Sequence, residues 1–427
     1  MDQPRRFLML QGPHGPFFDR LGRLLRAAGG EVWRVGFNRG DEAFWFDPAS
    51  YVAFDAPLAD WPARLDALLK ARGITDIVLY GDTRPVHAQA IAAARARGLT
   101  AHVFEEGYLR PWWVTYERGG ANGHSRLMDR SVAQMRAALA PLDVDLPDAP
   151  AHWGDMRHHV FYGALYHWFV ASRPGRYRAY RSHRDITVTR EFGLHLRRLL
   201  RMPRTALERR AAQARITRGG FPYHLCLLQL AHDASLQAHS PYDGNAAFID
   251  DVMAGFAAGA PRHHHLVFKA HPLEDGRTPL RATIRRLVRA HGLTGRVHVL
   301  HGGKLAGLMN EARSAITVNS TAAQQALWRG LPVKALGRSV YDKPEFVSDQ
   351  AVDAFFADPR RPDSRAYRDY RHYLLETSQV AGGFYSARGR RQLLRQVVDM
   401  MLDEHDPYDR LDKGRPALRQ NLKLVNG

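Results

Sequence analysis

The chain has 427 residues, of which 45% are hydrophobic and 24% charged, a composition typical of globular proteins that excludes an intrinsically disordered chain. This length accommodates two domains, each with a sizeable core. The formal net charge of +18 predicts an anionic partner, and charge alone leaves nucleic acid, an acidic membrane and a phosphorylated substrate open.

The N-terminal residues 1–18 contain an apolar run that is too short for a signal peptide, so we expect a first strand there. No segment has the composition of a membrane-spanning helix. Both features predict a cytoplasmic protein. The single cysteine, Cys226, lies in an apolar run and argues against a disulfide framework or a cysteine-rich metal site.

Short apolar runs alternate with helical patterns in two parts of the chain, separated by a basic segment at about residues 157–218. In the first part, we expect strands at 7–11, 31–37, 76–82 and 100–107, and helices at 17–29, 61–73 and 86–98, with Gly29, Gly73 and Gly98 as C-terminal caps. In the second part, we expect strands at 223–230, 265–271, 296–300, 314–320 and 332–336, and helices at 246–259, 280–292, 305–312 and 321–330.

This alternation predicts an α/β chain with parallel, doubly wound sheets, whose ligands bind where the strands end. Four regions are expected: an N-terminal Rossmann-like domain at residues 1–150, a basic helical insert at 151–219, a C-terminal Rossmann-like domain at 220–360, and helices at 361–427 that pack back on the domains.

The ends of the strands in the first domain carry candidate functional residues, which are Gln11, Gly12, Asp82, Arg84, Glu105, Glu106 and Arg110. A glycine there either lets backbone amides approach a ligand or only makes a turn. Adjacent acids are typical of a solvated turn. In a cleft, however, partial hydration raises a carboxyl pKa toward neutrality, as a general acid or base requires.

The strand ends of the second domain carry Gln229, His232, Asp233, Lys269, His271, Pro272, Asn319, Ser320 and Thr321. A lysine and a histidine after a buried strand can contact phosphate. Hydroxyl groups at the start of a helix, together with free amides, form an anion site. Asp233 and these hydroxyl groups are also typical of ordinary helix caps.

Taken in order, these motifs resemble the capsule polysaccharide biosynthesis family typified by KpsS and LipB, over nearly the whole chain. The segments that carry the resemblance include FLMLQGPHGPFF, DIVLYGDTRP, HVFEEGYLRPWWVTYERGGANG, LLQLAHDASLQAHSPY, FKAHP and VNSTAAQQALWRGLPVKALGRSVYD. Members of the family resemble bacterial sialyltransferases, with an acidic-acidic-Gly motif, an HP motif and a Ser/Thr motif on two Rossmann-like domains in the GT-B arrangement.

The resemblance implies a β-Kdo transferase that takes Kdo from CMP-β-Kdo and starts the poly-Kdo linker of a capsular polysaccharide on lysophosphatidylglycerol. The residues implied to bind the nucleotide sugar are Gln229, Lys269, His271, Pro272, Asn319, Ser320 and Thr321, and those on the acceptor side of the cleft are Gln11, Gly12, Asp82, Arg84 and Arg110. A phosphate leaving group needs no metal where cations and amides stabilise its charge, so no cofactor is expected.

Transfer with retention suggests a covalent sugar intermediate, by analogy with retaining glycosidases whose two carboxyl groups lie about 5 Å apart. We assign Asp233 as the candidate nucleophile and Glu106 as the acid/base, with Glu105 as its substitute. The family motif commonly reads Glu-Asp-Gly, whereas this chain has Glu-Glu-Gly, with a longer second acidic side chain.

The basic insert mixes aromatic residues with arginines, which suits an interfacial segment on an anionic membrane; the other interpretation is a solvated helical subdomain. The expected location is therefore the cytoplasmic face of the bacterial inner membrane. Expected partners are the lipid acceptor and other capsule assembly proteins, including a second Kdo transferase of the KpsC type, and no nucleic acid.

Two patterns that could suggest a metal are interpreted as structural. Asp143 and Asp145 form an Asp-x-Asp inside a proline-containing loop. The histidines at 263–265 lead into a strand, where adjacent side chains point to opposite faces and do not share a ligand.

Three other functions stay open from the sequence: a nucleic-acid-binding protein, a related GT-B enzyme with another nucleotide sugar, and a noncatalytic scaffold of capsule assembly. The first would explain the charge and leave the acidic and HP motifs unexplained.

Overall fold

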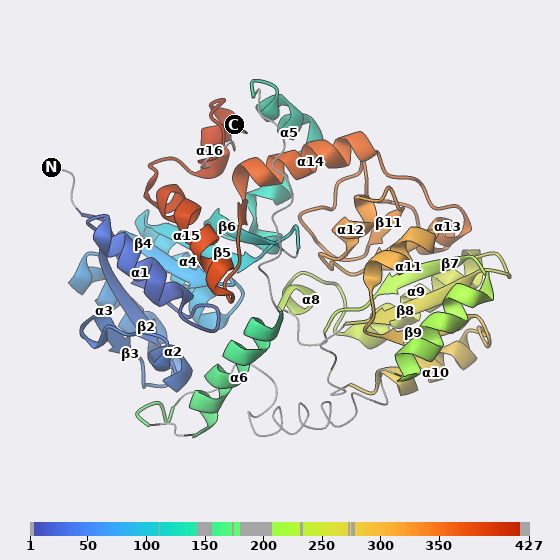
Figure 1. The fold of residues 1–427 in the computed structure, drawn as a ribbon, viewed down its shortest axis with the longest axis horizontal. Helices are drawn as coiled ribbons and strands as arrows, with labels where there is room; N and C mark the ends of the chain where they lie inside the picture. The colour runs from blue at the N-terminus through green and yellow to red at the C-terminus, as the bar shows by residue number, and fades with distance from the viewer. Residues whose placement is uncertain are drawn as a thin grey trace, which may run out of the picture. The chain divides into compact units, whose positions relative to one another are not determined.

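The computed structural model describes residues 4–110, 112–142, 156–172, 175–179, 207–230, 234–271, 274 and 278–418. The chain forms two compact units, each built around one β-sheet (Figure 1). Unit 1 comprises Met1–Arg126, Ala133–His183 and His372–Gly427, and unit 2 comprises Leu127–Val132 and Arg184–Arg371. The α/β class predicted from the sequence is confirmed.

Unit 1 contains a seven-stranded sheet with the order β12-β6-β5-β4-β1-β2-β3. Its strands are β1 (Arg6–Met9), β2 (Glu31–Gly36), β3 (Tyr51–Ala53), β4 (Asp76–Tyr80), β5 (Thr100–Glu106), β6 (Trp113–Arg118) and β12 (Gln379–Ala381). The strands β1 to β5 are parallel, and β6 and β12 extend the sheet antiparallel. The strand order reverses between β1 and β4, which is the point where an open α/β sheet forms a binding crevice.

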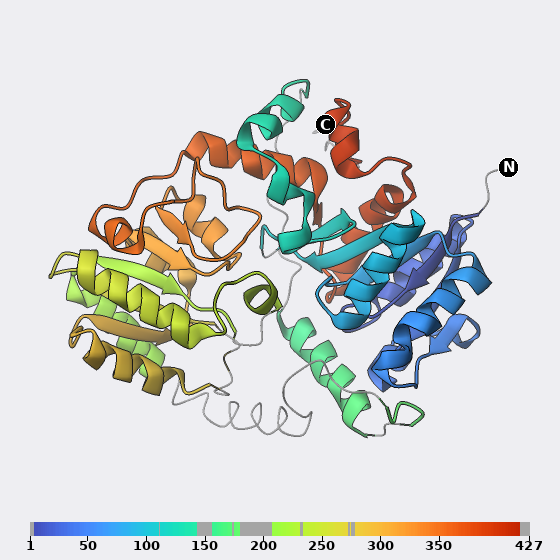
Figure 2. The ribbon, with the colours of Figure 1, turned by 180° about the vertical axis from the view of Figure 1, so that it is seen from behind.

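Helices cover both faces of this sheet because successive side chains of a buried strand point to opposite sides. Phe7 and Met9 of β1 pack with α1 (Phe17–Ala27) and α15 (Ala387–Leu402), which lie side by side in Figure 1. Leu8 and Leu10 pack with α3 (Trp61–Arg72) and α4 (Pro85–Arg97), whose blue ribbons face the viewer in Figure 2. Gly73 and Gly98 end α3 and α4 with positive φ, as predicted.

The helix α6 (Met156–Ser172) is attached to unit 1 through α2 (Arg39–Ala43). The hydroxyl of Tyr166 donates to Asp41 Oδ1 at 3.1 Å and accepts from Asn38 Nδ2 at 2.8 Å. Tyr166 is buried, and a Cβ at Gly40 would lie 2.6 Å from its ring, so α2 needs a glycine at the contact. These bonds fix one face of α6 against unit 1.

Unit 2 contains a five-stranded parallel sheet with the order β11-β10-β7-β8-β9. The strands are β7 (Tyr223–Leu227), β8 (His265–Ala270), β9 (Val297–His301), β10 (Ser314–Thr317) and β11 (Val333–Ala335). The helices α9 (Asn245–Gly259) and α10 (Leu280–Ala290) pack on one face. The helix α11 (Leu305–Glu311) lies on the other, where its Leu308 carbonyl accepts from Tyr223 Oη at 2.7 Å.

The remaining elements are shorter or lie outside the two sheets. They are α5 (Val132–Leu139), α8 (Ala234–Ala238), α12 (Ala323–Leu327), α13 (Val352–Ala357), α14 (Ser364–Thr377), α16 (Pro407–Asp412), a helical stretch at 207–219, and short 3-10 turns. In the part of the chain that the structure describes, no helix combines the length and apolar character needed to cross a bilayer.

The C-terminal segment supplies a strand as well as the expected helices, because β12 joins the edge of the unit 1 sheet. Gln379 is buried at the start of β12 and its side chain bonds in two directions. Its Nε2 donates to Thr115 Oγ1 at 3.0 Å, and its Oε1 accepts from the backbone N–H of Tyr108 at 2.8 Å and of Leu109 at 3.3 Å. This side chain therefore ties the C-terminal segment to the loop that follows β5.

We predict that Gln379→Leu destabilises unit 1 by about 1–3 kcal/mol, because two buried N–H groups lose their acceptor. Urea denaturation would measure this loss. The matched control is Gln89→Leu on the exposed face of α4, which should change stability by less than about 0.5 kcal/mol. Equal losses in both variants would contradict the role assigned to Gln379.

Candidate functional site

The strands β1, β4 and β5 are neighbours in the sheet of unit 1. Their carboxyl ends are where an open α/β sheet is expected to form its binding crevice. Gln11 follows β1, Asp82 follows β4, and Glu105 and Glu106 end β5. The structure therefore brings these predicted residues to one edge of one sheet.

Glu106 is held by two tyrosine hydroxyl groups. Its Oε1 accepts from Tyr80 Oη at 3.2 Å and from Tyr385 Oη at 3.1 Å. The ring of His159, on α6, stacks on Tyr385 with the ring centres 4.3 Å apart. Burial lowers the pKa of His159, although the negative charge of Glu106 has the opposite influence. The lowered pKa favours a neutral imidazole. Glu106 is thus a fixed carboxylate at the base of the crevice.

Glu105 belongs to the opposite face of the strand, because adjacent side chains of β5 alternate. Its Oε1 accepts from the backbone N–H of Glu106 at 3.0 Å. Burial, assisted by the negative charges of Glu106 and Asp82, raises the pKa of Glu105 to about 7, although the backbone hydrogen bond and Arg110 oppose the shift. A carboxyl group with this pKa can accept or donate a proton at neutral pH.

Gly107 completes the acidic-acidic-Gly motif for a steric reason. A Cβ at this position would lie 2.1 Å from the carbonyl oxygen of Trp113 on β6. The glycine therefore lets the end of β5 pass close to the neighbouring backbone. Arg110 Nε donates to the Gly107 carbonyl at 3.3 Å, which places its guanidinium beside the turn.

Asp82 is buried, and its two carboxylate oxygens differ in their hydrogen bonds. Oδ2 accepts from the backbone N–H of Ala121 at 2.8 Å and lies 3.0 Å from His124 Nδ1. Oδ1 is buried without a hydrogen-bond partner among the described residues. The negative charge that it leaves in the crevice contributes to the raised pKa of Glu105.

The other predicted residues of this crevice have partners within the fold. Gln11 Nε2 donates to Asp41 Oδ2 at 3.0 Å, and Gln11 Oε1 accepts from Arg84 Nη1 at 3.5 Å. A Cβ at Gly12 would lie 2.7 Å from the Phe18 ring, so packing accounts for this glycine. Gln11 and Gly12 therefore shape the loop that follows β1, and Arg84 contacts this loop through Gln11.

In unit 2 the strand order reverses between β7 and β10, and the two residues predicted there bind each other. Gln229 Nε2 donates to Asn319 Oδ1 at 2.9 Å, and the backbone N–H of Asn319 donates to Gln229 Oε1 at 3.1 Å. Both side chains are buried. Their amide groups join the two strand ends and are not free to contact a nucleotide.

Lys269, at the end of β8, is a buried cation. Its Nζ donates to the Ala270 carbonyl at 3.2 Å, and no carboxylate of the described residues pairs with it. Burial, with a contribution from the positive charge of Arg209, lowers its pKa to about 8. His271 directly follows the end of β8 and is half-buried. Uncompensated positive charge at a strand end is suited to an anion.

Ser320 and Thr321 lie directly before the short helix α12. Ser320 Oγ accepts from the backbone N–H of Ala322 at 3.3 Å, which is the bond of a local cap. The Ser320 carbonyl accepts from Tyr341 Oη at 2.8 Å. Thr321 is half-buried at the strand end.

Several predicted residues lie outside the described residues: His232, Asp233, Pro272, Asp143, Asp145 and much of the basic insert. Two of the three histidines at 263–265 have separate partners: His264 Nδ1 lies 3.0 Å from His224 Nε2, and His265 Nδ1, at the start of β8, lies 2.9 Å from His298 Nε2.

Sequence analysis missed four residues that surround these groups: Tyr80, His159, Tyr385 and Arg209. Tyr80 stands in a predicted strand, two residues before Asp82, and its position near the strand end was the available signal. His159 and Tyr385 reach Glu106 only through the tertiary packing of α6 and of the C-terminal segment.

Comparisons with known proteins agree with the motifs. Residues 75–385 match the model of a family described as "Capsule polysaccharide biosynthesis protein". The capsule polysaccharide export protein KpsS of Escherichia coli is 30% identical over 394 residues, covering 89% of this chain and 97% of KpsS. The capsule polysaccharide modification protein LipB of Neisseria meningitidis serogroup B is 29% identical over 391 residues, covering 90% and 93%. A solved structure, KpsC of Thermosulfurimonas dismutans, a beta Kdo 2,7 transferase, aligns with a TM-score of 0.44 at 11% identity, covering 93% and 100%.

We predict that Gly107→Ala costs roughly 1–3 kcal/mol of stability, because the new methyl group overlaps a backbone carbonyl. The matched control is Gly307→Ala in α11, where no atom lies within 4 Å of the added Cβ and stability should rise by about 0.5–1 kcal/mol. Thermal unfolding of both variants checks the contrast. A shift of the same sign and size in the two variants would refute the close approach.

Proposed function

This chain belongs to the capsule polysaccharide biosynthesis protein family, and from that membership we propose that it is a retaining β-Kdo transferase of capsule synthesis. It would move Kdo from CMP-β-Kdo to a lysophosphatidylglycerol acceptor and so start a poly-Kdo linker. The observation that carries the proposal is the pair Glu105 and Glu106 at the crevice, one carboxyl with a pKa of about 7 and the other fixed by two hydroxyl groups.

The acceptor step needs a base at the crevice. We place the proton of the acceptor hydroxyl with Glu105, because its pKa lies at the working pH, and we give Glu106 the task of orienting the acceptor. Sequence analysis assigned the base to Glu106 and kept Glu105 as its substitute. The two tyrosine hydroxyl groups favour the exchange of roles, since both donate to Oε1 of Glu106 and hold this side chain in place.

The donor step needs a nucleophile and a site for the leaving phosphate. In the proposed sequence, the Asp233 carboxylate attacks the anomeric carbon of Kdo, and CMP leaves with the electron pair of the broken carbon–oxygen bond. The acceptor oxygen then displaces Asp233 while its proton passes to Glu105. Two inversions give retention. Lys269 and His271 are the side chains of unit 2 suited to the phosphate, because Lys269 carries uncompensated charge.

Attachment to an anionic membrane is part of the proposal, since the acceptor is a lipid. On α6 the side chains of Val160, Phe161 and Trp168 are 58%, 59% and 59% exposed. Exposed apolar side chains grouped on one helix suit an interface rather than water. We place the protein at the cytoplasmic face of the inner membrane, beside other capsule assembly proteins, including a second Kdo transferase of the KpsC type.

Incubation of the pure protein with CMP-Kdo and a lysophosphatidylglycerol analogue, followed by product mass, tests the reaction directly. The expected product is heavier by one or more Kdo units. If the protein transfers a sugar from another nucleotide sugar and none from CMP-Kdo, the proposed donor is wrong and the protein is a glycosyltransferase of another specificity.

We predict that kcat of the wild type rises with pH through about 7, because Glu105 must be ionised to take the proton. Glu105→Gln should remove this limb of the pH profile and lower kcat by about 10²–10⁴-fold. Glu106→Gln should lower activity and keep the limb. If the limb survives in Glu105→Gln and disappears in Glu106→Gln, the proton belongs to Glu106.

We predict that Trp168→Glu reduces flotation with anionic liposomes at low salt, because it puts a negative charge among the exposed apolar side chains of α6, which are Val160, Phe161 and Trp168. The matched control is Trp328→Glu in unit 2, where the exposed ring lies under Arg371. Flotation of the Trp168 variant equal to that of the wild type would remove α6 from the membrane contact.

A further inference from the structure

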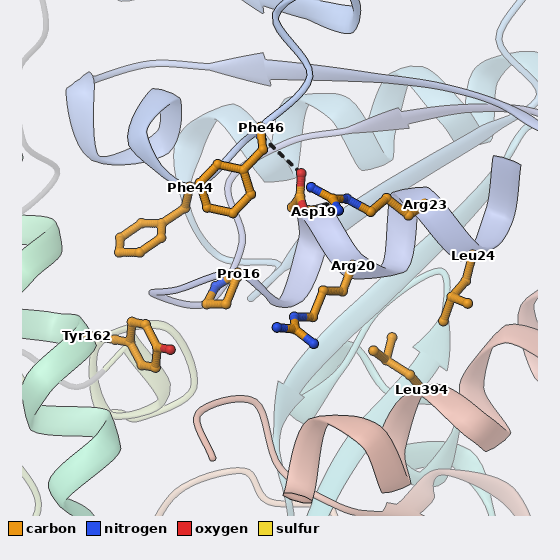
Figure 3. A pocket seen from close by; sticks show the side chains of 9 residues that line it. All are labelled: Pro16, Asp19, Arg20, Arg23, Leu24, Phe44, Phe46, Tyr162 and Leu394. Atoms are coloured by element: carbon orange, nitrogen blue, oxygen red, sulfur yellow. Dashed lines mark hydrogen bonds and ion pairs between the residues drawn. The ribbon is translucent and has the colours of Figure 1, made fainter. Parts of the chain in front are cut away.

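Unit 1 contains a pocket of about 560 Å³ beside α6, which the transfer chemistry does not use (Figure 3). Its walls are mainly apolar and include Leu24, Phe44, Phe46, Tyr162 and Leu394. Phe46 and Leu24 remain 58% and 42% exposed, so water contacts apolar surface here. This volume lies within the range of small-molecule sites, about 300–1,000 Å³.

Positive charge lies at one side of this pocket. Arg23 is neutralised by Asp19, with 2.9 Å between Nε and Oδ2. Arg20 lines the same space and, within the part of the chain that the structure describes, forms no ion pair. Arg390 lies over the Tyr162 ring at 5.5 Å, is buried, and keeps its Nε without an acceptor among the described residues. An apolar pocket lined by an arginine that forms no ion pair among the described residues is suited to an anionic amphiphile.

The pocket is connected to the carboxylate pair through contacts inside unit 1. Arg390 Nη1 donates to the Tyr385 carbonyl, and the hydroxyl of Tyr385 donates to Glu106. On α6, His159 stacks on Tyr385, and Tyr162, one turn later, lines the pocket. The pocket and Glu106 are thus joined by a chain of contacts inside unit 1.

We propose that this pocket binds the acyl chain of an anionic, single-chain phospholipid acceptor, with Arg20 at its phosphate. The inference rests on the proposed function, which requires a lipid acceptor, and adds the place where that lipid is held. One chain is specified because the apolar walls form a single pocket beside Arg20. Phe161, which is exposed on α6, has its ring centre 5.3 Å from that of Tyr162 in the pocket wall, and this side chain would receive the lipid from a bilayer.

Calorimetric titration with dodecanoyl lysophosphatidylglycerol, below its micelle concentration and without donor, tests the site. We expect binding at one site, no measurable binding of glycerophosphoglycerol, which lacks the chain, and weaker binding of uncharged dodecyl maltoside. Arg20→Gln should weaken binding of the anionic ligand about tenfold and leave the affinity for the maltoside unchanged. Arg64→Gln, an exposed arginine on α3, is the control for charge.

Leu24→Glu tests the apolar wall and should weaken the anionic lipid at least about tenfold, because it introduces a like charge and removes apolar contact. Leu58→Glu is the matched control, since Leu58 is 48% exposed, lies in unit 1 and does not line the pocket. The pocket assignment would be overturned if Leu24→Glu and Leu58→Glu lost equal affinity. It would also be overturned if Leu24→Glu and Arg20→Gln both bound the lipid as tightly as the wild type.

Kinetics separate this inference from the proposed function. If Kdo transfer occurs, Leu24→Glu should raise KM for the dodecanoyl acceptor with less effect on kcat, and the rise should shrink as the chain is shortened. Transfer with an unchanged KM would reject the pocket and keep the transferase. Lipid binding that responds to the variants, in a protein that transfers no Kdo, would keep the pocket and reject the transferase.

Discussion

The candidate site of unit 1 depends on the pairing of β12 with β6. Three residues, Gln379–Ala381, join the antiparallel edge of the sheet, and the Gln379 side chain bonds to the loop after β5. This pairing brings in the residues that follow it. Tyr385 reaches Glu106, Arg390 reaches Tyr162, and Leu394 forms a wall of the lipid pocket. The acidic motif therefore depends on a residue 279 positions away in sequence, and the pocket joins α1 to Leu394 of α15.

The sequence predicted the parallel cores well, because buried strands and their helices carry local signals. The strands β1, β2, β4 and β5 and the capping glycines lie where periodicity placed them. It did not predict β3, β6 or β12. The edge strands β3 and β12 have only three residues each, which is too few to show a period, and β12 is defined by its distant partner β6. The motifs placed Glu105 and Glu106 at a strand end, but the burial that sets the pKa of Glu105 near 7 comes from packing that no local pattern encodes.

The strand ends of unit 2 show a second limit of sequence patterns. Gln229 and Asn319 have the chemistry of ligand-binding amides, yet they satisfy each other across β7 and β10. Lys269 has the opposite character, because it is buried and without a carboxylate among the described residues. From residue type alone, Gln229, Asn319 and Lys269 were all interpreted as residues that bind the nucleotide sugar. The difference between a structural amide and a binding cation lies in whether a partner is already present, and that requires the fold.

The return of the C-terminal segment to the first sheet also constrains biosynthesis. Unit 2 is encoded almost entirely between two portions of unit 1, so a ribosome that has translated as far as residue 371 has released all of the second sheet and an incomplete first one. The Gln379 acceptor and the apolar face of α15 are both missing at that stage, and α1 covers its side of the first sheet without α15. A nascent chain thus exposes part of this face until α15 has been translated, and during that time the first sheet needs protection by chaperones.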